Sequence, residues 1–377
     1  LINSWEGALF DFDTDKLIAF ADEASKLGLE MLVMDDGWFG KRNDDTTSLG
    51  DWYVNETKLP GGLRRLIDAV HDRGMQFGIW FEPEMISPDS DLFRAHPDWH
   101  IHVPGREAMI GRTQYVLDMS RKEVVDNIWE QMYAILSENR IDYVKWDFNR
   151  NISDAASAIL DPEHQSEFFH RYMLGTYDLM NRLVTTFPQI LLENCSGGGA
   201  RFDPGMLFYS PQIWCSDDTD PIERLTIQGN LSYLYPQSTF GAHVSAAPHA
   251  QTLRNTPLTT RGNVSFFGCL GYELDLNHLL PVEEKEIKEQ TALYKRHRKL
   301  FQFGAFRRSH NGWQVTDGKT TLAGVFHGCV HAVPHQEYLR VRGLETGKTY
   351  RFRSRPQALR VGQFGDLVKH VVPVNLT

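Results

Sequence analysis

Apolar residues recur at helical spacing at several places in the first part of the chain. The apolar positions of residues 15–27 share one face of a helix, and those of residues 63–70 do so ahead of Gly74, which predicts a stop. Ser120 and Glu123 have the spacing of a capping box, which predicts that another helix begins there. These segments therefore predict amphipathic helices that each bury one face against a common core.

Short apolar runs lie between the helical segments, as expected for strands buried on both faces. Eight such runs are, in chain order, Ile2–Trp5, Met31–Met34, Phe77–Phe81, Tyr143–Trp146, Ile190–Leu192, Gln212–Trp214, Phe240–Val244 and Ser265–Leu270. Eight strands alternating with helices over about 300 residues predict an α/β fold, a (β/α)8 TIM barrel. A ninth run, Gln114–Met119, follows the turn-rich segment 88–111 and is interpreted as part of a long excursion after the third strand. A doubly wound open sheet is the competing architecture.

The pattern changes at about residue 305. Short alternating runs such as Tyr338–Val341 and Tyr350–Arg353, with turns at Asp317-Gly318 and Thr346-Gly347, predict a small antiparallel β-sandwich domain. We therefore expect two domains, a catalytic barrel over 1–304 and a small β domain over 305–377. The second has eleven Lys or Arg against four Asp or Glu, and we interpret this basic character as complementary to an acidic barrel.

Composition excludes several classes of partner. The chain of 377 residues carries a net charge of −10, which argues against nucleic acid or an anionic membrane as partner. The chain has no apolar run long enough to span a membrane, and its first ten residues do not have the pattern of a signal peptide. Four cysteines in a chain of this length do not make a disulfide framework, so we expect a cytoplasmic protein.

Acidic residues follow most of the predicted strands. Because a TIM barrel carries its active site at the carboxyl ends of its strands, these acids are the candidates for chemistry. They are Asp35, Asp36, Glu82, Glu84, Asp147, Glu193, Asp217 and Asp218. Such a ring, with tryptophans nearby, is typical of carbohydrate hydrolysis, and it also suits a divalent metal held by oxygen ligands. Lys145 and Arg150 flank Asp147 and would compete with a metal, so we expect neither a metal nor a cofactor.

Six blocks of the sequence together resemble the catalytic barrel of the retaining α-galactosidases of glycoside hydrolase family 36, the melibiases. The blocks are Asn3-Ser4-Trp5-Glu6, Asp35-Asp36-Gly37-Trp38-Phe39-Gly40, Trp80-Phe81-Glu82-Pro83-Glu84-Met85, Lys145-Trp146-Asp147-Phe148-Asn149-Arg150, Glu193-Asn194-Cys195-Ser196-Gly197-Gly198-Gly199 and Ser216-Asp217-Asp218-Thr219-Asp220. The small β domain resembles the C-terminal domain of that family. Members normally carry a large N-terminal β-sandwich domain before the first block, whereas this chain begins there. We expect either a short form or part of a longer chain.

The resemblance implies roles for the acids and for the residues around them. Asp147 resembles the nucleophile, with Lys145 supplying the positive field that keeps it ionised, and Asp217 resembles the general acid/base, with Asp218 as the rival candidate. We expect the pKa of Asp217 to be raised by burial and by the charge of Asp147. The residues that would bind the sugar are Asp35, Asp36, Trp80, Arg112, Lys145, Cys195, Gly198 and Trp214.

The function that the resemblance implies is that of a retaining exo-α-galactosidase acting on melibiose- and raffinose-type oligosaccharides. An α-galactosyl transglycosylase and an α-N-acetylgalactosaminidase are alternatives on the same scaffold. A catalytically silent sugar-binding fragment is the alternative from another class, although retention of both Asp147 and Asp217 argues against it. The sequence leaves the oligomeric state open, a homo-oligomer included.

Overall fold

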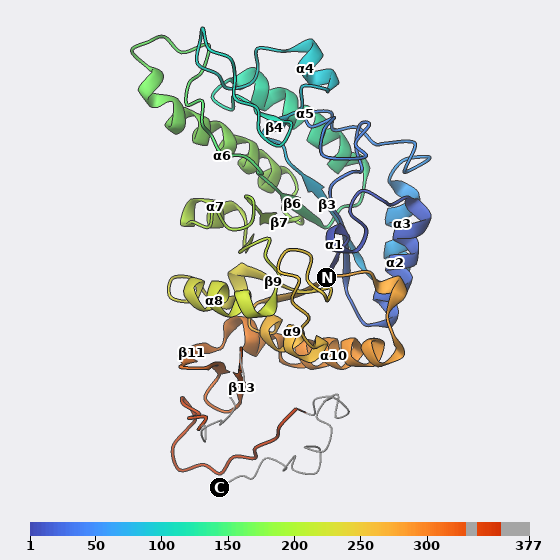
Figure 1. The fold of residues 1–377 in the computed structure, drawn as a ribbon, viewed down its shortest axis with the longest axis vertical. Coiled ribbons are helices and arrows are strands. Elements are labelled where there is room, and N and C mark those ends of the chain that lie inside the picture. The colour runs from blue at the N-terminus through green and yellow to red at the C-terminus, as the bar shows by residue number, and fades with distance from the viewer. Residues whose placement is uncertain (329–337, 356–377) are drawn as a thin grey trace.

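Parallel strands form a closed barrel at the centre of the molecule. The computed structural model describes residues 1–328 and 338–355, and its described part contains eight barrel strands (Figure 1). They are β1 (Ile2–Asn3), β2 (Met31–Met34), β3 (Gln76–Phe81), β6 (Tyr143–Trp146), β7 (Leu191–Asn194), β8 (Gln212–Trp214), β9 (Phe240–Ser245) and β10 (Cys269–Glu273). All of them pair in parallel in the order β1-β10-β9-β8-β7-β6-β3-β2.

The closure of the sheet distinguishes the two architectures that the sequence left in competition. Ile2 of β1 pairs with Leu32 of β2 on one side and with Tyr272 of β10 on the other, so the sheet has no free edge. The TIM barrel is therefore confirmed and the open doubly wound sheet is wrong. The register places Lys145 of β6 between Trp80 of β3 and Glu193 of β7, at the level where the strands end.

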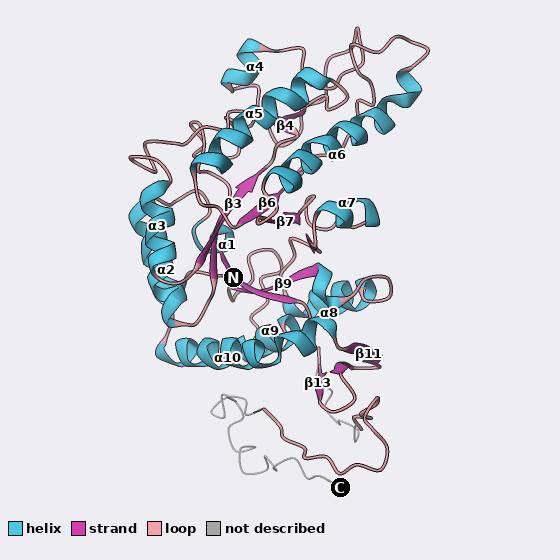
Figure 2. Ribbon diagram, turned by 180° about the vertical axis from the view of Figure 1, so that it is seen from behind, coloured by secondary structure: helices cyan, strands magenta, loops and turns pink. Residues whose placement is uncertain are grey.

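Helices surround the barrel (Figure 2). They are α1 (Trp5–Ala8), α2 (Thr14–Lys26), α3 (Arg64–Asp72), α5 (Lys122–Glu138), α6 (Phe168–Thr186), α7 (Pro204–Tyr209), α8 (Pro221–Leu231), α9 (Leu258–Ser265) and α10 (Pro281–Phe303). The predicted helices over 15–27 and 63–70 correspond to α2 and α3. Leu17, Phe20 and Ala24 of α2 are fully buried, which confirms the predicted apolar face. None of the described helices is both long enough and apolar enough to cross a membrane.

Two local predictions are wrong, each for a physical reason. The capping box does not form, because the Ser120 hydroxyl bonds to the Asp118 carboxylate and α5 begins only at Lys122. The run Ser265–Leu270 is not one strand, because α9 ends at Ser265 and β10 starts at Cys269. Phe266 and Phe267, which lie between the two elements, pack in a second core. Periodicity alone does not distinguish such a buried loop from a strand.

The excursion after β3 forms a small layer beside the mouth of the barrel. It contains β4 (Met85–Ile86), α4 (Asp91–Ala95) and β5 (Tyr115–Val116), and the two short strands pair with each other in antiparallel fashion. The run Gln114–Met119 therefore lies outside the barrel, as predicted.

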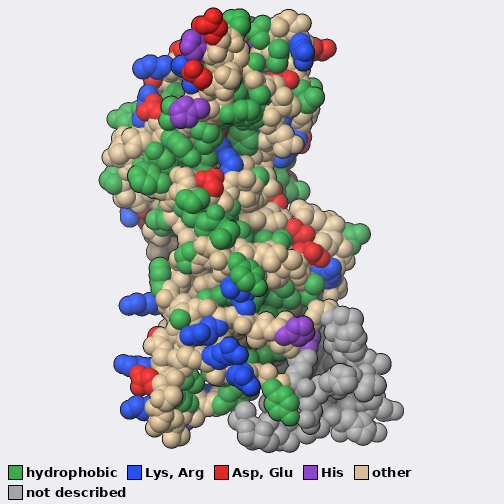
Figure 3. All heavy atoms as spheres, turned by 90° about the vertical axis from the view of Figure 1, so that its left-hand side faces the viewer, with side chains coloured by type: hydrophobic (Ala, Val, Ile, Leu, Met, Phe, Trp, Pro, Cys, Tyr) green, Lys and Arg blue, Asp and Glu red, His purple; other side chains and the backbone are tan. Residues whose placement is uncertain are grey.

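A three-stranded antiparallel sheet follows the barrel. It consists of β11 (Ala305–Ser309), β12 (Gly312–Thr316) and β13 (Thr321–Val325). Trp313 of this sheet packs against Phe267 of the barrel, with ring centroids 5.6 Å apart. Lys and Arg side chains gather on the lower part of the face seen in Figure 3, and Arg307 and Arg308 of β11 are both exposed.

The sandwich prediction is confirmed only for this one sheet. The turn at Asp317-Gly318 joins β12 to β13 and the turn at Thr346-Gly347 forms, but neither Tyr338–Val341 nor Tyr350–Arg353 is a strand. Tyr338 is 84% exposed and Phe352 is 51% exposed. In the described residues, these runs bury no apolar face that a second sheet would need. The rest of the predicted domain, 329–337 and 356–377, lies outside the described residues.

Aromatic side chains fill the core near the carboxyl ends of β2 and β3. Trp38, Phe39, Trp52, Trp80 and Phe81 are all at most 2% exposed, and the rings of Phe39 and Trp52 lie 4.4 Å apart. Trp38 donates a hydrogen bond from Nε1 to the carbonyl of Trp80 at 2.7 Å. Trp38 is thus a core residue, and it holds the backbone of Trp80 in place.

Two helical glycines make opposite predictions for stability. A Cβ on Gly175 of α6 would lie 1.8 Å from the backbone oxygen of Met119, whereas one on Gly229 of α8 would lie 3.7 Å from Trp313. We expect Gly175→Ala to lower the free energy of unfolding by about 1–3 kcal/mol, because α6 must move away. Gly229→Ala should raise it by about 0.5–1 kcal/mol, because alanine favours a helix. Urea unfolding of both variants measures this, and equal effects would contradict the packing described.

Candidate active site

The candidate acids converge at one end of the barrel because its strands are parallel. Asp35 follows β2, Asp147 follows β6 and Asp217 lies in the loop after β8. The carboxyl ends of parallel barrel strands form a single mouth, so residues far apart in the sequence meet there. Asp35 and Lys145, which are 110 positions apart, are in direct contact.

The carboxylate of Asp147 is held by three hydrogen-bond donors. Oδ2 accepts from Nε1 of Trp80 at 3.2 Å and from Nδ2 of Asn149 at 2.8 Å, while Oδ1 accepts from the backbone N–H of Phe148 at 2.8 Å. Hydrogen bonds of this kind restrict the orientation of a carboxyl group. Asp147 is also buried, with 7% of its surface exposed. Trp80, predicted as a pocket wall, therefore also orients this carboxylate.

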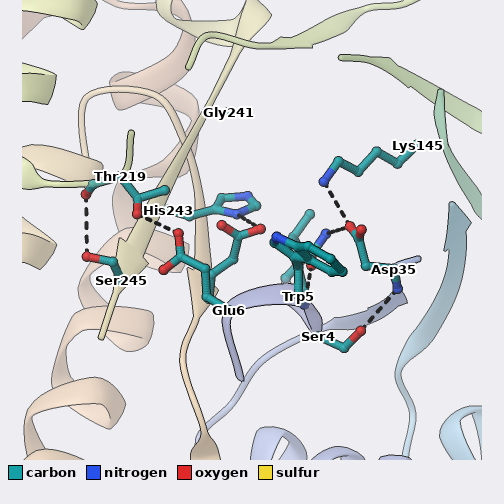
Figure 4. A network of polar contacts seen from close by, with 12 residues as sticks. Ser4, Trp5, Glu6, Asp35, Lys145, Thr219, Gly241, His243 and Ser245 are labelled. Carbon is teal, nitrogen blue, oxygen red and sulfur yellow. Dashed lines mark hydrogen bonds and ion pairs between the residues drawn. The ribbon is translucent and has the colours of Figure 1, made fainter. Parts of the chain in front are cut away.

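Lys145 forms its direct ion pair with Asp35. Nζ lies 2.8 Å from Oδ2 of Asp35, which also accepts a hydrogen bond from Nδ2 of Asn3 at 2.7 Å (Figure 4). Burial opposes the charge on Lys145, but Asp35 and more distant charges, Asp147 among them, raise its pKa well above the ordinary value. Lys145 therefore stays cationic, with Asp35 as its direct partner and Asp147 as a more distant one.

Asp36 is neutralised by a residue that the sequence did not single out. Arg42 donates from Nε to Oδ1 and from Nη2 to Oδ2 of Asp36, each at 2.8 Å. Burial raises the pKa of Asp36, and the guanidinium of Arg42 opposes that rise. Arg42 lies in the polar stretch 41–48, which as sequence is typical of a solvated loop, so no local signal marks it.

Cys195 lies near both Asp217 and Asp147. The Sγ atom of Cys195 is 4.0 Å from Oδ1 of Asp217, and burial, then Asp147, then Asp217 raise the pKa of this thiol well above the ordinary value. The side chain of Asp217 is reached by solvent, but surrounding protein partly desolvates its carboxyl group. That desolvation, followed by the charge of Asp147, raises the pKa of Asp217, as predicted.

Asp218 faces a different direction from Asp217. Its Oδ1 accepts the backbone N–H of Asp220 at 3.0 Å and lies 3.9 Å from Nε2 of His249. The carboxylate thus closes the turn that precedes α8. This geometry favours Asp217 over Asp218 as the acid that faces Asp147.

Arg224 of α8 holds the loop after β8. Its guanidinium donates to the carbonyls of Ser216 and Asp218, each at 2.6 Å, and to that of Gly241 at 3.0 Å. The same group lies 4.6 Å from the ring centroid of Trp214, which is itself buried. Arg224 is a second residue that sequence reasoning missed, because on its own it is only a polar position in a helix.

Gly198 packs against the loop that carries Asp217. A Cβ there would lie 2.8 Å from the Cα of Ser216 and 2.9 Å from the backbone nitrogen of Asp217, and its φ is +88°. Glycine is therefore required both by the conformation and by the close approach of two loops. The neighbouring Cys195 and Cys215 are free thiols.

Arg112 is the predicted binding residue that the structure does not bring to the others. Its side chain is exposed, and its backbone has a φ of 49° in the excursion loop. Arg150, which follows the Asp147 block, donates to the carbonyls of Gly111 and Met109, each at 3.1 Å. Arg150 thus links the loop of Arg112 to the end of β6.

The two glutamates after β3 have different environments. Glu84 is fully buried, pairs with Arg201 at 2.9 Å and accepts from Trp146 and Tyr172, so that its pKa is lowered despite burial. Glu82 accepts from the backbone of Asn149, and burial and the charge of Asp147 raise its pKa. Glu84 is therefore structural, whereas Glu82 interacts electrostatically with Asp147.

Other cavities and clusters do not compete with this mouth. Within 1–328 and 338–355, no group of three or more His, Cys, Asp or Glu has the arrangement of a metal site. A cavity of about 210 Å³ lies at the opposite end of the barrel, where Met31, Gln76 and Tyr143 begin their strands. It contains none of the candidate acids.

Comparison with known proteins places the chain in a family. Residues 1–304 match the family described as Melibiase. The chain is 49% identical over 359 residues to α-galactosidase Mel36A of Lactobacillus acidophilus, covering 93% of this chain and 49% of that protein. The crystal structure of GH36 α-galactosidase AgaA from Geobacillus stearothermophilus superimposes with a TM-score of 0.90 at 48% identity, covering 92% of this chain and 49% of that one. The α-galactosidase of Lactobacillus brevis gives a TM-score of 0.92 at 46% identity, covering 100% and 52%.

The chain spans about half the length of these relatives. The match nevertheless extends over the whole barrel and includes every strand end that carries a candidate acid. The chain therefore belongs to the Melibiase family.

Proposed function

We propose that this chain is the catalytic part of a retaining α-galactosidase, with Asp147 as nucleophile and Asp217 as general acid/base. The observation that carries the proposal is the contrast between two carboxyl groups beside one thiol. Asp147 accepts three hydrogen bonds, whereas the pKa of Asp217 is raised by desolvation and by Asp147. One group is thus held in a fixed orientation, as a nucleophile must be, and the other is suited to hold a proton, and these are the two roles that glycoside hydrolysis needs.

The named relatives support the activity and the substrate class. Mel36A and AgaA are both named α-galactosidases, and variants of AgaA have been solved in complex with raffinose and with stachyose. We therefore propose terminal α-galactosides of the melibiose and raffinose type as substrates of the protein to which this chain belongs.

The reaction follows as a double displacement. In the first step an oxygen of Asp147 attacks the anomeric carbon, the bond to the glycosidic oxygen breaks, and Asp217 gives its proton to that oxygen. In the second step the carboxylate of Asp217 takes a proton from water, and the water oxygen displaces Asp147 from the anomeric carbon. Both groups then return to their initial protonation states.

Sugar recognition is assigned to the charged groups around Asp147. After these ion pairs form, Lys145 and Arg42 still have N–H groups, and Asp35 and Asp36 still have lone pairs, that the pairing does not use. These groups can donate to and accept from sugar hydroxyls. We propose that Trp80 and Trp214 flank the ring, and that Cys195 and Gly198 shape the space for the axial hydroxyl of galactose. Arg112 stays a prediction as a contact from the excursion loop.

We also propose a cytoplasmic location and a separate small domain from residue 305. The first is supported by the free thiols of Cys195, Cys215 and Cys269, which suit a reducing compartment. The second is supported by the end of α10 at Phe303 and the start of an antiparallel sheet at Ala305.

Removal of the nucleophile tests the proposal directly. Asp147→Ala should abolish hydrolysis of 4-nitrophenyl α-galactoside, because no group remains to form the glycosyl-enzyme. Added azide should restore part of the turnover by entering the vacated space, and it should give β-galactosyl azide as product. Activity of the variant equal to that of the unmodified protein would exclude Asp147 as nucleophile.

The acid/base role predicts a dependence on leaving group and on pH. Asp217→Ala should reduce kcat/KM for raffinose by about 100-fold or more, but much less for the activated aryl galactoside, which departs without a proton. Since the pKa of Asp217 is raised, the unmodified protein should lose activity as pH rises through that pKa. Asp217→Ala should lack this alkaline decline. Asp218→Ala, measured in parallel, should keep both properties, and a reversed pattern would move the role to Asp218.

Specificity for galactose is tested at Asp36. Asp36→Ala should reduce kcat/KM on α-galactosides by about ten- to 100-fold, because a charged hydrogen bond to a buried hydroxyl contributes about 1.5–3 kcal/mol. It should not create α-glucosidase activity. Because the variant leaves Arg42 unpaired, the double variant Asp36→Ala/Arg42→Met serves as the control without a buried charge. Equal rates of the unmodified protein on α-galactosides and α-glucosides would contradict this assignment.

A further inference from the structure

Glu6 is the acid of the first sequence block, Asn3-Ser4-Trp5-Glu6, and the proposed mechanism does not use it. It lies in α1, in the turn that follows β1, and its side chain points toward Thr219 in the loop after β8 (Figure 4). Oε1 accepts a hydrogen bond from the hydroxyl of Thr219 at 2.6 Å, although the two residues are 213 positions apart. The contact therefore joins the first β/α unit to the segment that carries Asp217.

The Thr219 hydroxyl is part of a directed chain of hydrogen bonds. The backbone N–H groups of Gln251 and Thr252 point at Nδ1 of His249, at 3.4 and 3.3 Å, so this nitrogen accepts and Nε2 carries the proton. Nε2 lies 2.8 Å from the Thr219 hydroxyl and donates to it. The hydroxyl in turn donates to Glu6. Thr219 is thus held from both sides, and it lies two positions after Asp217.

The charges around Glu6 leave this contact in place at neutral pH. Burial and the facing carboxyl group of Glu273 raise the pKa of Glu6, while Arg224 and Lys145 oppose the rise. Ionised or protonated, Glu6 keeps an oxygen that can accept from Thr219. The bond does not require a particular charge state of Glu6.

The backbone of the loop that carries Asp217 has contacts on other sides as well. Gln251 donates from Nε2 to the carbonyl of Asp217 at 3.3 Å, and the hydroxyl of Ser245 lies 3.4 Å from the carbonyl of Thr219. Arg224 binds the carbonyls of Ser216 and Asp218 from the helix that follows. Glu6 reaches Thr219 from α1, which follows the first strand of the barrel. A loop held at both ends can keep the Asp217 carboxyl group in one place across the mouth from Asp147.

We propose that Glu6 is a positioning residue for the general acid/base: by accepting the hydrogen bond from Thr219 it fixes the loop after β8 and thereby the carboxyl group of Asp217. This inference rests on the proposed function, because it assigns no role to Glu6 apart from that of Asp217. The glutamate at this position then belongs to the catalytic blocks without touching the sugar.

The test compares two substrates by kcat/KM, which reports the step in which the leaving group departs. Glu6→Ala should lower kcat/KM for raffinose by about tenfold, because misplacing a general acid forfeits part of its catalytic contribution. For 4-nitrophenyl α-galactoside, whose leaving group needs no proton, the loss should stay below about threefold. Glu6→Gln keeps an acceptor oxygen and should restore most of the activity on raffinose.

Two further variants separate positioning from general damage. Thr219→Val removes the hydroxyl while keeping the side-chain shape, and it should reproduce the selective loss of Glu6→Ala. The double variant Glu6→Ala/Thr219→Val should lose no more kcat/KM on raffinose than either single variant, since both substitutions remove the same hydrogen bond. Glu289→Gln on α10, where the side chain is 52% exposed, is the matched control and should have no effect.

Hydrogen exchange of the loop gives a readout that does not depend on activity. The backbone N–H of Asp220, which bonds to the Asp218 carboxylate, should exchange faster in Glu6→Ala and Thr219→Val than in the unmodified protein. Equal losses on both substrates, additive losses in the double variant, or unchanged exchange would overturn the positioning role. Failure of the proposed function is distinct, because Asp217→Ala would then itself show no dependence on the leaving group.

Discussion

The ion pair between Lys145 and Asp35 is the interaction on which the mouth of the barrel depends. A parallel barrel brings acids from many strands to one end, and buried carboxylates close together repel one another unless cations lie among them. Lys145 stands at the level where β6 ends, pairs directly with Asp35 at 2.8 Å and faces Asp147 and Glu273 at longer range. Breaking such a buried pair by removing one partner costs about 3–5 kcal/mol, because the other charge is left buried and unpaired.

Other buried cations either pair with one of the remaining acids or bind backbone carbonyls. Arg42 neutralises Asp36 through two hydrogen bonds, and Arg201 does the same for Glu84. Arg224 donates to backbone carbonyls instead of pairing with an acid, and in this way it holds the loop after β8. Asp147 is oriented without an arginine, by Trp80, Asn149 and the backbone N–H of Phe148.

Close packing fixes the loops as firmly as charge does. Gly198 approaches the backbone of Ser216 and Asp217 so closely that no side chain fits between them, and Glu6 of α1 accepts a hydrogen bond from Thr219. The loop after β8 is thus confined by contacts from α1, α8 and the loop after β7. General acid catalysis requires such confinement, because a proton donor displaced from hydrogen-bond reach of the leaving oxygen contributes little.

Much of this architecture could be predicted from sequence because it rests on local patterns. Apolar runs alternating with helical periodicity predict the barrel, and parallel strands bring Asp35, Asp147 and Asp217 to one mouth whatever the details of packing. The order of the six blocks identifies the family for the same reason, since each block is a strand end with its first loop residues. One error fell at Ser265–Leu270, where an apolar run packs in a second core, and another fell where the Ser120 hydroxyl bonds to Asp118 instead of capping α5.

Only the tertiary structure decided which charges meet. Arg42 and Arg224 come from a polar loop and a helix whose local sequences resemble any solvated segment, and their partners are fixed by how those segments fold over the mouth. The exposure of Arg112 and the burial of Trp38 could not be predicted from sequence either, because the residue type does not determine which other segments will pack against a side chain. Sequence by itself determined the fold and the identities of the acids; packing between distant segments determined their partners and their orientation.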